Sequence, residues 1–253
     1  MRLNNKVALI TGASGAIGLA TAKLFAAEGA KVMLADMGED QLKKAVEEIG
    51  AEVADYAVVD VTDEQQVKAM VDKTVARFGK VDVFLANAGI EGQIGNIADT
   101  DVSNLRKVLD VNVVGVWLGM HYVIPEMKKN GGGSIIITSS GAGVIGSPGS
   151  APYNTSKHAV IGLMRCAALE YAADNIRVNT VNPGPIDSRM MRSIEDGYGA
   201  EHAAEFREKI MAATPMGRYG QPQEISPMML FLATDEASYC TGSVYMVDGG
   251  NAT

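Results

Sequence analysis

Apolar positions along the chain follow two alternating patterns. Short runs rich in β-branched residues predict strands, and the longer segments between them, where apolar residues recur every three or four positions, predict helices. The predicted strands span residues 7–11, 31–36, 53–60, 81–87, 134–139, 177–182 and 243–247. The predicted helices span residues 17–28, 39–49, 64–78, 102–127, 153–172 and 222–233.

The alternation of strands and helices indicates the fold class. Runs such as 81–85 and 135–138 are nearly all apolar, which is typical of strands covered by helices on both faces. Strand–helix–strand units of this kind are right-handed and build parallel sheets. The sequence therefore predicts an α/β fold: a doubly wound, Rossmann-type, mostly parallel seven-stranded sheet with helices on both faces.

The chain contains no linker rich in proline, glycine or serine, so residues 1–253 are expected to form a single domain. One segment, residues 187–214, interrupts the alternation of strands and helices and is rich in Met, Glu and Ala. We expect it to be helical. Because ligands of open α/β sheets bind outside the carboxyl ends of the strands, this segment is predicted to be a lid over the substrate.

Composition and charge narrow the range of partners. The chain has 253 residues, of which 47% are hydrophobic, and this suffices for one core. Its net charge of −8 argues against nucleic acid and anionic membrane surfaces as partners. The most apolar stretch, residues 111–125, contains polar residues and glycines and is too short to span a bilayer.

The N-terminus and the cysteines bear on the cellular compartment. Residues 1–11 contain only a short apolar run and no cleavage site of a signal peptide. Cys166 and Cys240 are far apart and belong to no partner motif. We expect free thiols, buried or semi-buried, in a reducing compartment. Together these features predict a cytoplasmic protein.

A glycine-rich turn follows the first predicted strand. It reads Gly12-Ala13-Ser14-Gly15-Ala16-Ile17-Gly18 and leads into a helix. Small residues there let the backbone approach a pyrophosphate, and the free N–H groups at the start of the helix favour an anion. The sequence therefore predicts a dinucleotide site at this turn.

The second predicted strand ends at Asp36. A carboxylate at this place can accept hydrogen bonds from both hydroxyls of the adenosine ribose, and it would repel a 2′-phosphate. Ser14 and Met37 are the residues that could instead receive that phosphate, and neither is basic. The expected cofactor is NAD, not NADP.

Several short motifs follow one another along the whole chain. They are Thr11-Gly12 with Ile17-Gly18, Asp60-Val61, Asn87-Ala88-Gly89, Asn112, Ser140, Tyr153-Asn154-Thr155-Ser156-Lys157, Pro183-Gly184 and Asp248-Gly249-Gly250. In this order and spacing they resemble the short-chain dehydrogenase/reductase family, in its single-domain branch. That branch usually has its second glycine where this chain has Ala16. The resemblance implies a homotetramer.

The resemblance also implies which residues contact the cofactor. Asp60 and Val61 would flank the adenine, residues 87–89 would line the cofactor, and residues 183–188 would hold the nicotinamide carboxamide. The full set of expected cofactor contacts is Gly12, Ser14, Ile17, Gly18, Asp36, Asp60, Val61, Asn87, Ala88, Gly89, Tyr153, Lys157, Pro183, Gly184, Ile186 and Ser188.

Tyr153 and Lys157 are four residues apart, so they share one face of a helix. Oxidising an alcohol requires a base on its oxygen, and a tyrosine with its usual pKa near 10 is a poor base at neutral pH. A nearby ammonium group and the positive nicotinamide ring would lower that pKa. Lys157 would also hold the nicotinamide ribose and so orient the ring.

Two further residues receive catalytic roles from the resemblance. Ser140 would donate a hydrogen bond to the substrate oxygen. Asn112 would anchor a water that relays protons from Lys157, and the alternative of a buried structural amide stays open. His121 and His158 have no second ligand at metal spacing, so we expect no metal.

The substrate is indicated only by the apolar character of the segments near the site. The predicted lid carries Met190, Met191, Ile194 and Tyr198, and the loop before Tyr153 carries Val144, Ile145, Ser147 and Pro148. These residues suit a hydrophobic or cyclic secondary alcohol, although a lid helix also needs an apolar face for packing. Arg189, Arg192 and Arg218 could bind a charged group.

Three functions are weighed from these features. The leading one is an NAD-dependent oxidoreductase that moves a hydride between NAD(H) and an apolar or cyclic secondary alcohol or its ketone, with Tyr153 as general acid and base. The second is a reductase of 3-oxoacyl thioesters on a carrier protein, against which Asp36 and the acidic net charge argue. The third is a non-catalytic NAD-binding regulator, which would have no need of Ser140, Tyr153 and Lys157.

Overall fold

Seven parallel strands form the centre of the computed structural model, which describes residues 1–252. The strands are β1 Val7–Thr11, β2 Lys31–Asp36, β3 Ala54–Val58, β4 Val83–Ala86, β5 Gly133–Thr138, β6 Ile176–Pro183 and β7 Val244–Val247. They lie in the order β3-β2-β1-β4-β5-β6-β7, and every neighbouring pair is parallel. The predicted fold class is confirmed, and the order reverses between β1 and β4, where such sheets bind ligands.

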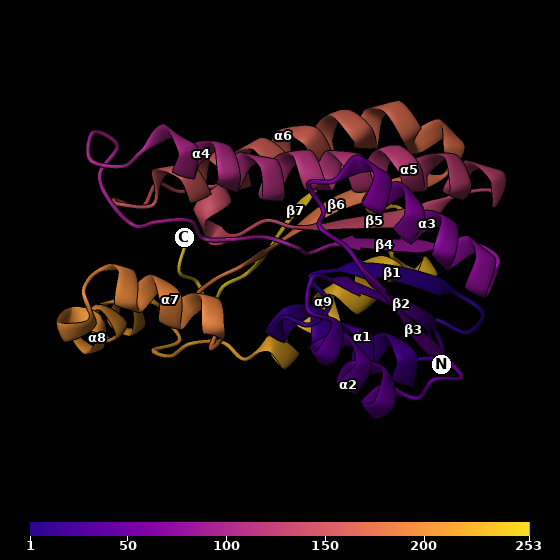
Figure 1. Cartoon of the computed structure of the whole chain (residues 1–253), viewed down its shortest axis with the longest axis horizontal. Coiled ribbons are helices and arrows are strands. Elements are labelled where there is room, and N and C mark those ends of the chain that lie inside the picture. Colours follow the sequence, from indigo (N-terminus) through magenta and orange to yellow (C-terminus); the bar gives the residue numbers. More distant parts are fainter. Residues whose placement is uncertain (253) are drawn as a thin grey trace.

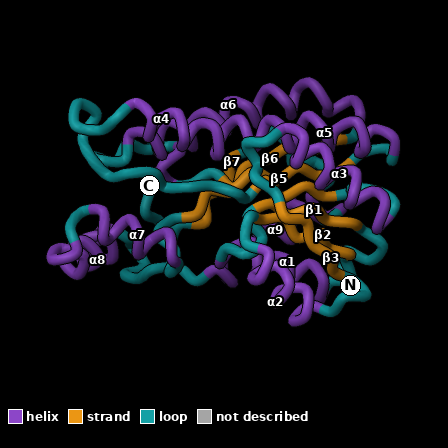
Figure 2. Tube along the Cα trace, viewed as in Figure 1, coloured by secondary structure: helices purple, strands orange, loops and turns teal. Residues whose placement is uncertain are grey.

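Helices cover both faces of the sheet (Figures 1 and 2). One layer holds α3 Glu64–Phe78, α4 Val102–Leu109, α5 Gly115–Lys129 and α6 Ala151–Tyr171. The other holds α1 Ala16–Ala27, α2 Glu39–Ile49 and α9 Pro222–Ala233. Each layer buries its own hydrophobic cluster against the sheet.

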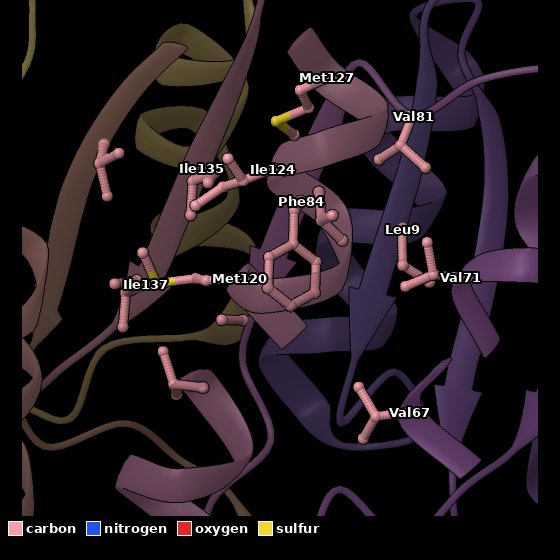
Figure 3. Close-up of a cluster of buried hydrophobic side chains, with 14 of the residues drawn as sticks. Leu9, Val67, Val71, Val81, Phe84, Met120, Ile124, Met127, Ile135 and Ile137 are labelled. Carbon is pink, nitrogen blue, oxygen red and sulfur yellow. The ribbon is translucent and has the colours of Figure 1, made fainter. Parts of the chain in front are cut away.

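The packing of α5 on the sheet shows how closely these layers meet. Met120, Ile124 and Met127 of α5 belong to the larger cluster, in which they lie beside Phe84 of β4 and Ile135 and Ile137 of β5 (Figure 3). Gly119 lies so close to the sheet that a Cβ there would be 2.4 Å from Cζ of Phe84. Glycine at this position therefore lets the helix approach the strand.

The helix predicted over 102–127 is interrupted. A π-helical turn, Asp110–Val114, separates α4 from α5, and it contains Asn112. The whole helical run Val102–Lys129 is long and apolar enough to cross a membrane by length and composition. Its buried face packs on the sheet, as in the core helix of a globular protein, while Trp117 and Val102 are exposed. Single-turn π segments inside α-helices often mark functional sites.

Of the two free cysteines, Cys240 is partly buried, as expected, but Cys166 is exposed. The expectation of a buried or semi-buried thiol at Cys166 is therefore wrong. The expectation came from the usual burial of free cysteines, but Cys166 lies on a face of α6 that does not meet the core.

The segment 187–214 is helical, as expected. It contains α7 Arg189–Gly197 and α8 Ala203–Ala213, which project beyond the carboxyl end of β6 (Figure 1). A short β-bridge between Ile186 and Gly220 fixes its two ends, with the amide of Asp187 donating to the carbonyl of Gly220 at 2.9 Å. We call residues 187–214 the excursion.

Candidate active site

A cavity of about 1310 Å³ lies at the carboxyl ends of the strands. The β1–α1 turn lines one part of it, and the excursion lines another. The predicted site residues that line it are Gly12, Ser14, Ile17, Asp36, Asp60, Val61, Asn87, Ala88, Gly89, Ser140, Tyr153, Lys157, Pro183, Gly184, Ile186 and Ser188. Gly18 and Asn112 are the two predicted site residues that are not part of the cavity wall.

The β1–α1 turn forms a glycine cradle. Gly12 has φ +63°, a conformation that favours glycine, and Gly15 precedes the first residue of α1. A Cβ on Gly18 would lie 2.3 Å from the carbonyl oxygen of Gly12. Gly18 therefore supports the turn by close packing, while the start of α1 faces the cavity. This geometry fits a pyrophosphate at the helix N-terminus.

Asp36 at the end of β2 is held by the same turn. Its Oδ2 accepts hydrogen bonds from the amide of Ser14 at 3.0 Å and from the Ser14 hydroxyl at 2.6 Å. Its Oδ1 accepts from the amide of Met37 at 2.7 Å. Met37, Gly38 and Gln41 line the cavity beside it, so this part of the wall carries no positive charge.

Asn87 connects three strands beneath the cavity. Its Nδ2 donates to the carbonyls of Thr11 at 3.3 Å and Gly12 at 3.1 Å, and its Oδ1 accepts from the hydroxyl of Thr138 at 3.0 Å. β1, β4 and β5 are thereby fixed relative to the glycine cradle. Asn87 therefore braces the centre of the sheet in addition to lining the cavity.

Asn112 is 1% exposed and all its polar atoms are bonded. Its Oδ1 accepts from the amide of Ile90 at 2.8 Å, and its Nδ2 donates to the carbonyl of Ile90 and the hydroxyl of Ser156, both at 2.9 Å. The side chain therefore joins the loop after β4 to α6. Of the two interpretations left open by the sequence, the structural amide matches these contacts, and the water relay stays a prediction.

Ser140, Tyr153 and Lys157 lie together on the cavity wall. Ser140 caps the short helical turn after β5, and its Oγ accepts from the amide of Ala142 at 3.1 Å. Lys157 is 4% exposed, and its Nζ donates to the carbonyl of Thr138 at 2.8 Å. The same Nζ is 5.5 Å from the centre of the Tyr153 ring.

Burial shifts the pKa values of Tyr153 and Lys157 in opposite directions. The pKa of Tyr153 lies above its usual value, and not below it as expected from a neighbouring ammonium group: burial raises it to about 12, a hydrogen bond with Ser140 opposes that rise, and the charge of Glu91 adds to it. Burial lowers the pKa of Lys157 to about 8. Groups with strongly shifted pKa values in a cavity are typical of catalytic sites.

Residues 183–188 form a wall opposite these groups. Gly184 lies so close to the C-terminal segment that a Cβ there would be 2.7 Å from Cα of Asp248. Ser188 caps α7, with its hydroxyl accepting from the amide of Met191 at 3.3 Å. The Asp248-Gly249-Gly250 motif thus supports the strand end that carries the predicted carboxamide contacts.

Sequence reasoning missed several residues of the wall. Thr138, Phe206 and Ile210 line the cavity, as do the basic residues Arg106 and Lys107 of α4. Phe206 and Ile210 are four apart on α8, so helical spacing was the available signal for them. Among residues 1–252, no group of three or more His, Cys, Asp or Glu side chains is placed to hold a metal ion.

Comparisons with known proteins agree with this geometry. The family described as "Enoyl-(Acyl carrier protein) reductase" matches residues 12–252. Cyclohexanol dehydrogenase of Acinetobacter sp. (strain SE19) is 40% identical over 98% of this chain and 95% of its own.

Two solved structures share the fold over nearly the full length. Levodione reductase has a TM-score of 0.94 and 36% identity, covering 99% of each chain. A 3-ketoacyl-(acyl-carrier-protein) reductase from Brucella melitensis, complexed with NADH, has a TM-score of 0.90 and 32% identity, covering 99% of this chain and 100% of its own. The chain belongs to the short-chain dehydrogenase/reductase family of oxidoreductases, which bind a nicotinamide cofactor and act on alcohols and ketones.

Proposed function

We propose that this protein is an NAD-dependent dehydrogenase that interconverts an apolar or cyclic secondary alcohol and its ketone. One observation carries the proposal: Ser140, Tyr153 and Lys157 share a single cavity with the glycine cradle and Asp36. A cofactor lying along that cavity would bring its reactive end to the three side chains. The relative named for cyclohexanol supports a cyclic substrate.

The chemistry assigned to each residue follows from its contacts. When bound, the nicotinamide ring would exchange the hydride with the carbinol carbon. Tyr153 would move the proton on the substrate oxygen, donating it in ketone reduction and accepting it in alcohol oxidation. Ser140 would donate a hydrogen bond to that oxygen, and the ammonium group of Lys157 would favour the phenolate form of Tyr153.

The preference for NAD rests on Asp36. Its carboxylate has hydrogen bonds from Ser14 and Met37, and its neighbours in the wall are uncharged. A 2′-phosphate placed there would face a negative charge and no cation. Replacing Asp36 with alanine removes that charge and frees the two donors of Ser14, so it should lower the ratio of kcat/KM with NAD to kcat/KM with NADP by about tenfold to a hundredfold.

Asp72→Ala is the matched control for this prediction. It removes one carboxylate from an exposed pair with Lys68, away from the cavity. The ratio should stay at the parent value in this variant. If Asp36→Ala also keeps the parent ratio, Asp36 does not select the cofactor.

The pH dependence of ketone reduction should report Lys157. With its pKa lowered to about 8 by burial, this side chain is an ammonium ion below that pH and neutral above it. Tyr153, with its pKa raised to about 12, remains a proton donor across the same range. The kcat/KM for a ketone with saturating NADH should therefore be flat in mild acid and fall as the pH rises through about 8. A profile that stays flat through this region would contradict the role of Lys157.

A panel of alcohols distinguishes this proposal from its alternatives. Aliphatic, cyclic, aryl and steroid alcohols and a 3-hydroxyacyl thioester would each be offered with NAD and with NADP, and NADH or NADPH formation followed by absorbance. We expect the highest kcat/KM for a cyclic alcohol with NAD. Highest activity with the thioester would favour the carrier-protein reductase, and NADH binding without any turnover would favour a regulator.

The homotetramer and the cytoplasmic location stay predictions. In support of assembly, Trp117 of α5 is 58% exposed and Leu169 of α6 is 84% exposed. Large apolar side chains on adjacent helices of one layer are typical of surfaces that pair with another chain.

A further inference from the structure

The tip of the excursion is attached to the rest of the protein by Tyr198, the residue that follows α7. Its phenol donates to the carbonyl of Pro148 at 2.6 Å and lies 3.5 Å from the hydroxyl of Ser150. Both residues belong to the loop that precedes the catalytic helix α6. The Tyr198 ring also stacks on Phe206 of α8, with ring centres 4.3 Å apart and an angle of 18° between planes.

A third segment meets the same place. A Cβ on Gly149 would lie 3.3 Å from the Tyr198 hydroxyl and 3.3 Å from Cγ2 of Ile94, which follows β4. A Cβ on Gly197 would lie 2.6 Å from Cγ1 of Ile94. The loop after β4, the loop before α6 and the end of α7 therefore converge on Tyr198.

The base of the excursion is held by different contacts. The Ile186–Gly220 bridge joins its two ends, and Arg192 pairs with Asp187 and with Glu195, which is 5% exposed. These contacts hold the start of α7 whether or not the tip is attached. The phenol hydrogen bond of Tyr198 is exposed to solvent, so it adds the modest stabilisation of one hydrogen bond and can break more readily than the contacts at the base.

Tyr198 is at the same time part of the cavity wall. Ile194, Phe206 and Ile210 line the cavity with it, and all three are apolar. The only polar group of the Tyr198 side chain is directed to Pro148. This end of the cavity thus presents aromatic and aliphatic surface to a substrate.

We propose that Tyr198 is a specificity-determining residue that both latches the excursion and forms the end wall of the substrate cavity. Building on the proposed function, it restricts the substrate to compact, uncharged ring alcohols and ketones. A ring with a long alkyl substituent would have to displace the Tyr198–Phe206 pair and break the contact with Pro148. Two substitutions separate the latch from the wall.

Tyr198→Phe removes the hydrogen bond and keeps the ring. The tip should open more often, and trypsin should cleave after Arg207 or Lys209 of α8 about 2-fold to 10-fold faster, as expected for one lost hydrogen bond. Tyr122→Phe is the control, because it also loses one phenol hydrogen bond, to Glu64, and does not line the cavity. A cleavage rate equal to that of the parent in Tyr198→Phe overturns the latch.

Tyr198→Ala removes the wall as well. We expect the ratio of kcat/KM for a long 4-alkylcyclohexanol to kcat/KM for cyclohexanol to rise about tenfold or more, since buried apolar contacts would replace a clash. NADH binding, followed by fluorescence, should remain at the parent value. An unchanged ratio in a variant that binds NADH overturns the specificity role.

The two proposals fail in different ways. If the parent turns over no cyclic alcohol, the proposed function fails, and the proteolysis comparison still decides whether Tyr198 latches the excursion. If the parent is active and Tyr198→Ala keeps its substrate ratio, only the specificity role fails.

Discussion

Tyr153→Phe should lower kcat by about 10²-fold to 10⁴-fold, the usual contribution of a general acid or base. The phenol lies on the cavity wall, where the proposed mechanism has it exchange a proton with the substrate oxygen, and phenylalanine keeps the ring without the hydroxyl. The ring packing beside Lys157 would persist, so NADH affinity should change little. Steady-state rates with a cyclic ketone and NADH titration by fluorescence measure the two effects separately.

The control for this prediction lies on the same helix. Tyr171→Phe makes the identical chemical change at the end of α6, outside the cavity, and should keep the parent kcat. If Tyr153→Phe loses NADH binding together with activity, Tyr153 is mainly structural. If it retains the parent kcat, another group carries the proton.

Lys157→Met should lower kcat by about 10²-fold to 10³-fold, which is typical for loss of a group that stabilises charge in the transition state. Methionine fills a similar volume but carries no charge and cannot donate to the carbonyl of Thr138. The Tyr153 phenolate would lose its neighbouring cation, and the substrate oxygen would then be harder to protonate or deprotonate.

The pH profile separates this role from a structural one. If Lys157 is the titrating group, the fall of ketone reduction near pH 8 should disappear in Lys157→Met. A variant that is merely destabilised would show a lower rate with the same fall. Lys68→Met, which breaks an exposed ion pair with Asp72, should match the parent in both rate and profile.

Periodicity predicted the fold well because both faces of the central strands, such as β1 and β4, are covered. Strands β1 and β2 have the predicted bounds, 7–11 and 31–36. Strand β3, Ala54–Val58, is shorter than the predicted 53–60 at both ends, although the amide of Val59 still donates to the carbonyl of Asp36 at 2.9 Å. Pattern alone does not reveal where pairing with a neighbouring strand stops.

The π-helical turn at Asp110–Val114 could not be predicted from periodicity. Its residues continue the apolar pattern of the helix, and the irregular turn is coupled to tertiary bonds that Asn112 makes with Ile90 and Ser156. Those partners are distant in sequence. That Ser140, Tyr153 and Lys157 lie together could be predicted, because their spacing depends on one strand end and one helix.

Contacts between segments that are distant in sequence could not be predicted either. Two examples are the hydrogen bonds between Ser14 and Asp36 and the stacking of Tyr198 on Phe206. Both depend on how loops meet at the carboxyl edge of the sheet. The apolar residues of the excursion were noted in the sequence, yet Phe206 was not, because its partner could only be seen once α7 and α8 were folded against each other.

The proposed hydride transfer between NADH and a ketone can be tested directly with labelled cofactor. The protein would be incubated with cyclohexanone and NADH that carries deuterium at the transferred position, and the product analysed by mass spectrometry. Direct hydride transfer from NADH should give cyclohexanol with one deuterium on the carbinol carbon. Cyclohexanol without deuterium, or none at all from folded protein that binds NADH, would contradict it.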